Sequence, residues 1–388
     1  MTAGEKIGGD RILCIRMSGL GDVVHALNAL TLLRRERPTA RIDWVVGDRF
    51  AGLLRGHPYV ENLVVVPRRR WGGMLKSPLR WTELSRRMKT TAARLSRAGY
   101  AASVDFQSSL KSAWLVRAAQ ADLRIGFARP VNRELNFLMQ NRLVEVPAEG
   151  VHRIERDIAL LRPLGIAPRY APPVLPGDPS ERRAVDRMLN RLPGTGPLVV
   201  IHPGTSRFAA FKRWLPDRYA EVGDHLVAER KADVLVTWGP EDRPMAREVA
   251  DRMQRGGTLS PPTESLRRYA ELLRRADLFI GSDTGPMHLA SALGIPVVAL
   301  FGPKDPEQTG PYCSRSIVVT GRADCRPCDR RKCTHVRCMT SITVGQVRRA
   351  ALDVLDGAGR CPARQRNLPR VLDQRPNRPV ERDVPLQP

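Results

Sequence analysis

The sequence predicts an α/β protein made of two similar halves, each with a parallel sheet that carries helices on both faces. Short apolar runs alternate with helical or loop segments, which is the pattern of a parallel sheet. The alternation breaks at residues 165–197 and then starts again. Because the chain has 388 residues, it is long enough for two domains with a cleft between them.

The first half begins with an apolar run at residues 12–16, which predicts a strand. A turn with two glycines follows at residues 18–22, and apolar side chains then recur at helical spacing as far as Leu33. Further short strands are predicted at residues 43–47, 62–67 and 100–105. These elements belong to a predicted N-terminal domain of residues 1–175.

Five prolines between residues 168 and 179 resist regular structure, so this segment is expected to link the two halves. The second domain is predicted over residues 176–356. Its strands are expected at residues 198–202, 232–238, 278–281 and 296–301, and its helices near residues 217–229, 243–254 and 286–293. Residues 357–388 are dominated by Arg and Pro, which predicts a disordered tail.

The composition favours a folded protein of the cytoplasm. Hydrophobic residues make up 42% of the chain and charged residues 27%, as in ordinary soluble proteins. No uncharged apolar run reaches the length of a membrane span, and residues 1–10 lack the apolar region of a signal peptide. The seven cysteines are odd in number and mostly clustered, which disfavours a disulfide scaffold.

The net charge of +24 raises the alternative of a nucleic-acid-binding protein, because a basic surface condenses on phosphates. Both halves of the chain are basic, and only eight of the 64 basic residues are Lys. The sequence contains no recognisable nucleic-acid-binding module, so a nucleic-acid partner is not expected.

The first glycine turn, Ser18-Gly19-Leu20-Gly21-Asp22, places free N–H groups at the start of a helix, where they can face an anion. Val24 stands where a dinucleotide fingerprint has its third glycine, and no GxxxxGK[ST] occurs, so NAD-binding and P-loop hypotheses lose support. Asp22 has two interpretations. It either stabilises the helix from its first turn, or acts as a general base toward a hydroxyl, with His25 facing it from the next turn.

Two further turns offer groups that suit a diphosphate. His202-Pro203-Gly204-Thr205-Ser206 precedes the cations Lys212 and Arg213, although an ordinary loop with solvated charge is the alternative. The turn Ser282-Asp283-Thr284-Gly285-Pro286-Met287-His288 starts a second helix. Asp283 or Thr284 is expected to cap this helix, with Pro286 in its first turn and His288 projecting from it.

Together these motifs resemble the ADP-heptose:lipopolysaccharide heptosyltransferases of glycosyltransferase family 9. The resemblance runs from about Arg11 to Val347 and rests on SxLGDVVH, on HPGTS followed by KRW, and on SDTGPMHLASALGIPVVALFGPKDPEQTGPY. It implies a GT-B fold with two Rossmann-like domains facing a central cleft. The acceptor is then expected on the first domain and the sugar nucleotide on the second. The resemblance also implies inverting transfer without an obligatory metal or other cofactor.

The resemblance assigns a role to each motif. Asp22 resembles the base that deprotonates the acceptor hydroxyl. The predicted donor-binding set consists of Ser18, Gly19, Gly21, Thr205, Ser206, Lys212, Glu241, Asp283, Thr284, Gly285 and His288. Within this set, Thr205, Ser206 and Lys212 resemble the contacts that stabilise the leaving ADP, and Glu241 resembles the residue that contacts the nucleoside. Leu215 separates Trp214 from Pro216, where some members of the family read KxWP.

Residues 68–97 hold ten basic residues and one acid, Glu83, with aromatic and apolar residues between them. A solvated helix face is one interpretation. In an acceptor domain, the same pattern suits an anionic glycolipid at a membrane surface. The predicted acceptor-binding residues are Arg69, Arg70, Lys111 and Arg133.

The spacing Cys325-x2-Cys328-x4-Cys333-x4-Cys338 is dense enough for a tetrahedral zinc or an iron–sulfur site. A structural zinc and unligated thiols remain open as alternatives, and no catalytic metal is assigned. Cys14, Cys313 and Cys361 are expected to be core or incidental positions.

The leading hypothesis is an inverting transferase that moves a heptose from ADP-heptose to the inner core of lipopolysaccharide, in the Kdo-lipid A region. Such an enzyme is expected in the cytoplasm, bound peripherally at the inner-membrane surface. A transferase of the same family that uses another nucleotide sugar or glycan is the alternative. A basic nucleic-acid-binding protein is the third hypothesis.

Overall fold

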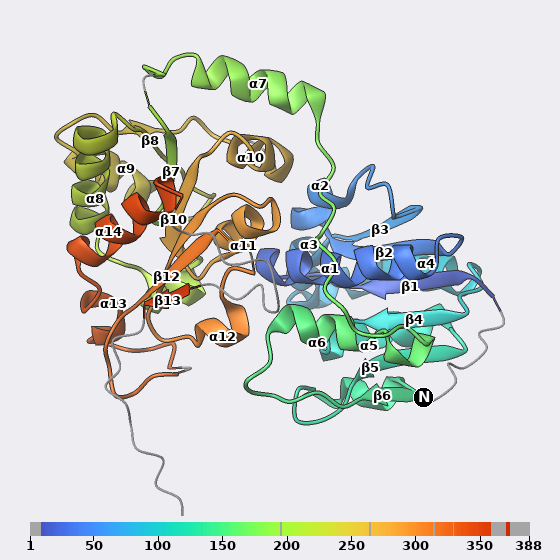
Figure 1. Cartoon of the computed structure of the whole chain (residues 1–388). Coiled ribbons are helices and arrows are strands. Elements are labelled where there is room, and N and C mark those ends of the chain that lie inside the picture. Colours follow the sequence, from blue (N-terminus) through green and yellow to red (C-terminus); the bar gives the residue numbers. More distant parts are fainter. Residues whose placement is uncertain are drawn as a thin grey trace, which may run out of the picture.

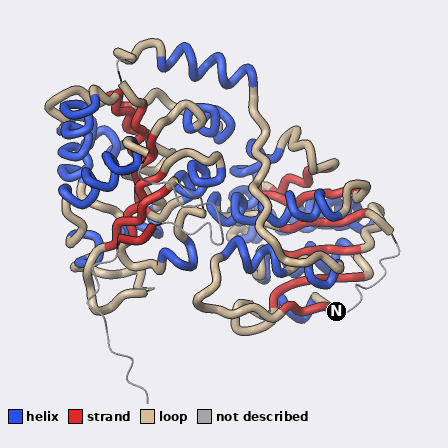
Figure 2. Tube along the Cα trace, in the orientation of Figure 1, coloured by secondary structure: helices blue, strands red, loops and turns tan. Residues whose placement is uncertain are grey.

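The structure is a computed structural model that describes residues 9–132, 134–194, 196–263, 265–312, 315–328, 330–357 and 370–372. Two α/β lobes face each other, and each has a central sheet between helices (Figure 1, Figure 2). All recorded strand pairings in both sheets are parallel. The predicted fold class is therefore confirmed.

The N-terminal sheet has the strand order β3-β2-β1-β4-β5-β6. Its strands are β1 (Arg11–Ile15), β2 (Arg41–Gly47), β3 (Asn62–Val66), β4 (Ala102–Asp105), β5 (Leu123–Phe127) and β6 (Arg142–Val144). The helices of this lobe are α1 (Leu20–Glu36), α2 (Ala51–Leu54), α3 (Arg68–Leu75), α4 (Trp81–Ser96), α5 (Leu110–Ala119) and α6 (Arg153–Ala159). Short 3-10 helices are η1 (Asp48–Phe50), η2 (Pro78–Arg80), η3 (Leu135–Met139) and η4 (Arg162–Leu164).

Two apolar cores fill the two faces of this sheet, as strands buried on both sides require. Leu27 of α1 and Trp44 of β2 belong to the core on one face. Leu13 of β1, Met74 of α3 and Leu115 of α5 belong to the core on the other face. The layer formed by α3, α4 and α5 therefore covers one face of the sheet, and α1 with α6 covers the opposite face.

The C-terminal sheet has the strand order β13-β12-β11-β10-β7-β8-β9. Its strands are β7 (Leu198–His202), β8 (Asp233–Val236), β9 (Thr258–Leu259), β10 (Leu278–Ser282), β11 (Val297–Phe301), β12 (Ser316–Thr320) and β13 (Arg370–Leu372). The helices are α8 (Pro216–Arg230), α9 (Arg243–Arg252), α10 (Leu266–Leu273), α11 (Gly285–Ala292), α12 (Pro306–Thr309), α13 (Arg337–Thr340) and α14 (Val344–Leu355), with the 3-10 helix η5 (Arg207–Lys212).

The segment between the lobes starts as predicted and then forms a helix. Residues 166–178 are neither helix nor strand, in agreement with their prolines. Helix α7 (Pro179–Leu189) follows, and lies outside the two sheets (Figure 1). The Asp178 carboxylate caps α7 by accepting hydrogen bonds from the N–H groups of Ser180 and Glu181.

The end of the chain adds one strand that the sequence did not predict. Residues 370–372 form β13, which pairs with β12. The remaining residues of the predicted tail after Gly357 lie outside the described residues. Within the described ranges, no helix has both the length and the apolar character needed to cross a membrane.

The two lobes meet through the N-terminal ends of α1 and α11, which pack against each other. Gly285 approaches Leu20 so closely that a Cβ atom on the glycine would lie 2.5 Å from the Leu20 Cβ. A Cβ on Gly21 would overlap the His288 ring. Both glycines are therefore needed for the close approach of two helix N-termini from different domains.

Candidate active site

A cleft of about 2070 Å³ lies between the lobes, where loops that follow strands of both sheets meet. This is where open parallel sheets bind ligands. Asp22 and every residue of the predicted donor-binding set line this cleft. The sequence motifs, which lie up to 270 positions apart in the chain, are thus brought to one site.

Helix α1 presents its unpaired N–H groups to the cleft. Its N-cap, Gly19, has a φ of 80° and makes no side-chain capping hydrogen bond. The left-handed conformation suits glycine, and an added Cβ would also overlap the Asp22 carboxylate. With the N-terminus of α11 beside it, the site offers two helix dipoles to one anion.

Two guanidinium groups hold the Asp22 carboxylate in place. Arg16 Nη2 lies 2.8 Å from Asp22 Oδ2, and Arg153 Nη1 lies 2.8 Å from Oδ1. Burial by itself raises the pKa of Asp22, but the two arginines outweigh burial and the pKa lies below its usual value. Asp22 is therefore ionised at neutral pH and oriented, and a carboxylate with one guanidinium on each oxygen still has lone pairs for a hydroxyl.

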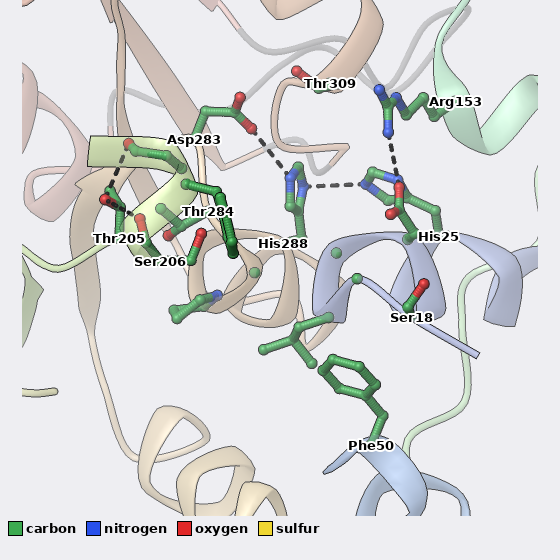
Figure 3. A pocket seen from close by; sticks show the side chains of 18 of the residues that line it. Ser18, His25, Phe50, Arg153, Thr205, Ser206, Asp283, Thr284, His288 and Thr309 are labelled. Carbon is green, nitrogen blue, oxygen red and sulfur yellow. Dashed lines mark hydrogen bonds and ion pairs between the residues drawn. The ribbon is translucent and has the colours of Figure 1, made fainter. Parts of the chain in front are cut away.

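A chain of polar contacts runs from the donor side to α1. Lys212 Nζ lies 2.5 Å from Asp283 Oδ2, and Asp283 Oδ1 lies 3.3 Å from His288 Nε2. His288 Nδ1 is in turn 3.1 Å from His25 Nε2 (Figure 3). The recorded partner of His25 is not Asp22: the His25 ring crosses the domain boundary and contacts His288.

The two imidazole rings link the donor side to α1. Asp283 accepts from His288 Nε2, and His288 Nδ1 shares a hydrogen bond with His25 Nε2, whose direction depends on the tautomers of the two rings. Burial, followed by the charges of His288 and His152, lowers the pKa of His25 well below its usual value. His25 Nδ1 is buried without a hydrogen-bond partner. Lys212 and His288 together hold the pKa of Asp283 low despite its burial.

The loop after β7 is held by its own contacts. Thr205 Oγ1 donates to the Ala209 carbonyl at 3.0 Å and accepts from Arg213 Nε at 3.0 Å. His202 Nε2 lies 3.3 Å from the Asp242 carboxylate, which fills the space where Gly204 lacks a side chain. Phe208 lines the cleft with 82% of its surface exposed, which is unusual for a large apolar side chain.

The predicted helix cap of α11 is only half confirmed. Thr284 occupies the N-cap position and a proline stands in the first turn, as predicted. The Thr284 hydroxyl, however, donates to the Ser282 carbonyl at 3.2 Å, and Asp283 is held by Lys212 and His288. The N–H groups of the first turn of α11 therefore receive no side-chain cap.

The predicted acceptor residues that the structure describes do not lie inside the cleft. Arg69 forms an ion pair with the other domain, since its Nη2 lies 3.3 Å from Glu241 Oε1, whereas Arg70 pairs with Glu83 at 3.3 Å. Lys111 is exposed on α5. These three residues do not line the cleft, although Arg68 does, and Arg133 lies outside the described residues.

Four functional candidates escaped the sequence prediction: Arg16, Gln107, Arg153 and Asp157. Gln107 Oε1 accepts hydrogen bonds from the N–H groups of Met17 and Ser18 and from the Ser18 hydroxyl, at 3.0 to 3.1 Å. It thereby shapes the turn before α1. They come from three segments: Arg16 follows β1, Gln107 follows β4, and Arg153 and Asp157 lie one turn apart on α6. None of the four belongs to a motif that the sequence prediction used.

Asp157 differs from Asp22 although both line the same wall. Its burial raises its pKa to about 7, against the opposing effect of Arg16, and the charge of Asp22 raises it further. Asp157 is therefore close to half protonated at neutral pH. A strongly perturbed carboxyl group in a cleft is typical of a functional site.

The cysteine cluster does not form a metal site among the described residues, where no group of three or more Cys, His, Asp or Glu side chains is arranged to hold a metal ion. Cys325 is exposed, Cys328 and Cys333 are half-buried, and Cys338 is buried. The structure thus gives no support to the zinc hypothesis. Cys14 is a buried core residue as predicted, whereas Cys313 and Cys361 lie outside the described residues.

Comparisons with known proteins agree on one family. Residues 88–338 match the glycosyltransferase family 9 (heptosyltransferase) domain. The chain is 34% identical to lipopolysaccharide heptosyltransferase 1 of Pseudomonas aeruginosa over 84% of this chain and 88% of that protein. It is 30% identical to lipopolysaccharide heptosyltransferase 1 of Escherichia coli K12 over 79% of this chain and 92% of that protein.

Solved structures give the same result. The E. coli heptosyltransferase WaaC with ADP superposes with a TM-score of 0.69 at 27% identity, covering 89% of this chain and 99% of that one. A family 9 glycosyltransferase from Veillonella parvula has a TM-score of 0.75 at 20% identity, covering 91% and 99%, and supports the fold. From its fold and its sequence, the chain belongs to glycosyltransferase family 9, the heptosyltransferases.

Proposed function

We propose that this protein transfers a heptose from ADP-heptose to the inner core of lipopolysaccharide, in the Kdo-lipid A region, with inversion at the anomeric carbon. One observation carries the proposal: an oriented carboxylate, Asp22, and the predicted diphosphate contacts, which include Lys212, line one cleft but belong to different domains. The relatives named above are lipopolysaccharide heptosyltransferases, and WaaC was solved with ADP-2-deoxy-2-fluoro heptose.

The donor diphosphate is proposed to bind beside the adjoining N-termini of α1 and α11. Lys212 Nζ lies 2.5 Å from Asp283 Oδ2. A diphosphate offers this ammonium a second anionic partner, and Thr205 and Ser206 lie on the same wall of the cleft. As the bond from the anomeric carbon to the phosphate oxygen breaks, these groups stabilise the charge on the departing ADP.

Asp22 is proposed to act on the acceptor. The acceptor hydroxyl oxygen bonds to the anomeric carbon while its proton passes to an Asp22 oxygen, and ADP leaves from the opposite face of the sugar. Arg16 and Arg153 keep the carboxylate ionised and aimed. A low pKa weakens Asp22 as a base in isolation, but the proton needs to move only after the oxygen has begun to bond.

The protein is further proposed to work in the cytoplasm at the inner-membrane surface, where a glycolipid acceptor is presented, and to need no cofactor. The mixed basic and apolar character of residues 68–97 supports a membrane location. Metal occupancy of the four clustered cysteines stays a hypothesis, which elemental analysis of purified protein would test.

Mass analysis of products tests the proposed function. Purified protein and Kdo-lipid A are incubated with one donor at a time: ADP-heptose, ADP-glucose or a UDP-sugar. The proposal predicts a product heavier by one heptose with ADP-heptose alone. Transfer from another nucleotide sugar, with none from ADP-heptose, would contradict the proposed donor and support a family member that uses a different nucleotide sugar.

A further inference from the structure

The outer surface of the α3, α4 and α5 layer combines exposed apolar side chains with unpaired cations. We call this surface, together with η3, the interfacial face. Its exposed apolar residues are Leu75, Leu79, Trp81, Leu110, Leu135, Leu138 and Met139. Its cations include Lys76, Arg86, Lys89 and Lys111, and none of these four forms an ion pair with a described carboxylate.

The elements of the interfacial face are neighbours in space. Helix α3 contacts α4, α4 contacts α5, and α5 contacts η3. Leu79 is 94% exposed and therefore almost fully in water, and Leu138 is 63% exposed. Exposed apolar residues that gather on one surface mark an interaction site.

Helix α4 shows this division most clearly. Its buried residues Leu84 and Leu95 face the sheet core. The opposite side bears a shallow hollow of about 600 Å³ lined by Trp81, Thr82, Ser85, Arg86, Lys89 and Thr90. These positions repeat at helical spacing, so an indole, three hydroxyls and two cations share one helix face without a carboxylate. Hydroxyls and cations suit a phosphate, and an indole suits the boundary between water and lipid.

The interfacial face connects directly to the cleft. Arg68, the first residue of α3, lines the cleft, as do Ser108, just before α5, and Val131, just before η3. Each of these three segments leaves the carboxyl end of a strand and continues onto the interfacial face. A lipid-linked acceptor held at that face therefore has its sugar head beside the N-terminal wall, which is the part of the cleft lined by the N-terminal domain.

We infer that the interfacial face lies on a bilayer of anionic phospholipid, with the hollow on α4 binding lipid phosphates and the leucines of η2 and η3 entering the acyl boundary. The inference rests on the proposed function, because a glycolipid acceptor is presented in a membrane. A second copy of the chain fits less well, since a symmetric contact would bring unpaired cations against cations. Nucleic acid would leave the exposed leucines without a partner.

Vesicle flotation of the full chain tests this inference. Wild-type protein is expected to bind vesicles of phosphatidylcholine mixed equally with phosphatidylglycerol and not vesicles of phosphatidylcholine alone. Because each interfacial cation contributes about 1 kcal/mol, Arg86→Gln with Lys89→Gln should weaken binding about 30-fold. Leu135→Ser with Leu138→Ser should weaken binding at least about tenfold.

The matched control is Arg183→Gln with Arg187→Gln, which removes the same charge from exposed positions on α7. The control should bind vesicles like the wild type, and all variants should keep the wild-type melting temperature. Transfer to a deacylated, water-soluble acceptor should be unchanged in the Arg86/Lys89 and Leu135/Leu138 variants. If the wild type does not transfer heptose at all, the proposed function is contradicted, whereas the vesicle-binding result is unaffected.

Three results would overturn the inference. The first is unchanged vesicle binding in both interfacial variants, and the second is an equal loss in the α7 control. The third is that the wild type self-associates, or binds duplex DNA in a salt-dependent way, and that the interfacial variants lose this association but still bind vesicles.

Discussion

The two walls of the cleft are built in different ways. The C-terminal wall, which is the part of the cleft lined by the C-terminal domain, consists of two strand-end loops: Thr205 and Ser206 are neighbours in one, and Asp283, Thr284 and Gly285 are neighbours in the other. The N-terminal wall surrounds Asp22 with single side chains from separate segments. The proposed diphosphate site therefore depends on backbone shape, whereas the proposed base depends on a few charged side chains from other segments.

Their electrostatics differ as well. On the C-terminal wall, Asp283 is balanced by an ammonium and an imidazole, and its pKa is held low. On the N-terminal wall, two carboxyl groups share the same arginines: the pKa of Asp22 is lowered, whereas that of Asp157 is raised to about 7. The charges of the C-terminal wall are thus balanced, whereas on the N-terminal wall Asp22 is ionised and Asp157 is partly protonated.

Replacement of the proposed base is expected to have the largest effect. Asp22→Asn removes the proton acceptor while keeping the size of the side chain, so the rate of heptose transfer should fall by about 10³-fold. A product-formation assay at saturating donor measures this effect. Near-wild-type transfer by Asp22→Asn would remove Asp22 from the chemistry.

On the opposite wall, Lys212→Ala should act on the donor instead. Loss of an ammonium contact to the diphosphate should weaken ADP binding about 100-fold, as measured by titration calorimetry. Lys231→Ala, on the same domain but outside the cleft, is the control. Equal ADP affinity in Lys212→Ala and the control would contradict the proposed diphosphate contact.

Asp157 should affect stability rather than donor binding. Its folded pKa of about 7 lies above the unfolded value, so the wild type loses stability as the pH rises from about 4 to 7. Asp157→Asn removes this loss and should be more stable by on the order of 4 kcal/mol at pH 8, with no gain at pH 4. Chemical denaturation at both pH values measures the difference, and an equal effect at both would show that Asp157 keeps an ordinary pKa.

His25 should show the opposite pH dependence with a smaller effect. Its folded pKa lies below the unfolded value, so the contribution of neutral His25 is complete above about pH 6.5 and is lost at lower pH. His25→Gln should therefore cost about 1 kcal/mol at pH 8, because it disturbs the contact to His288, and less near pH 5. Chemical denaturation of the wild type and the variant from pH 8 to pH 5 tests this pH dependence. A stability loss that grows as the pH falls would contradict it.

The sequence was sufficient for the fold class and for most of the C-terminal wall. Strand β7 matches its predicted bounds, because a short apolar run between turn residues leaves little freedom in its placement. The motifs around Thr205 and Asp283 were predictable because strand, turn and helix N-terminus are neighbours in the chain. The strands β5, β6, β9, β12 and β13 were missed, being short or lacking a turn motif at their ends.

The N-terminal wall was not predictable beyond its first turn. Arg153 reaches Asp22 from a position 131 residues away, and Gln107 supports Ser18 from 89 residues away. One arginine among many in a basic chain carries no signal of this role. The acceptor prediction accordingly chose Arg69 and Arg70 by charge density, whereas the neighbouring Arg68 is the one that lines the cleft.

If the N-terminal wall carries out the chemistry and the C-terminal wall binds the donor, the two functions can be separated by one substitution. The experiment is titration of the Asp22→Asn variant with ADP, beside its transfer assay. Because the substitution leaves Arg16 and Arg153 near the donor site, we expect ADP affinity equal to or tighter than that of the wild type, together with lost transfer. Loss of ADP binding as large as that of Lys212→Ala would contradict it.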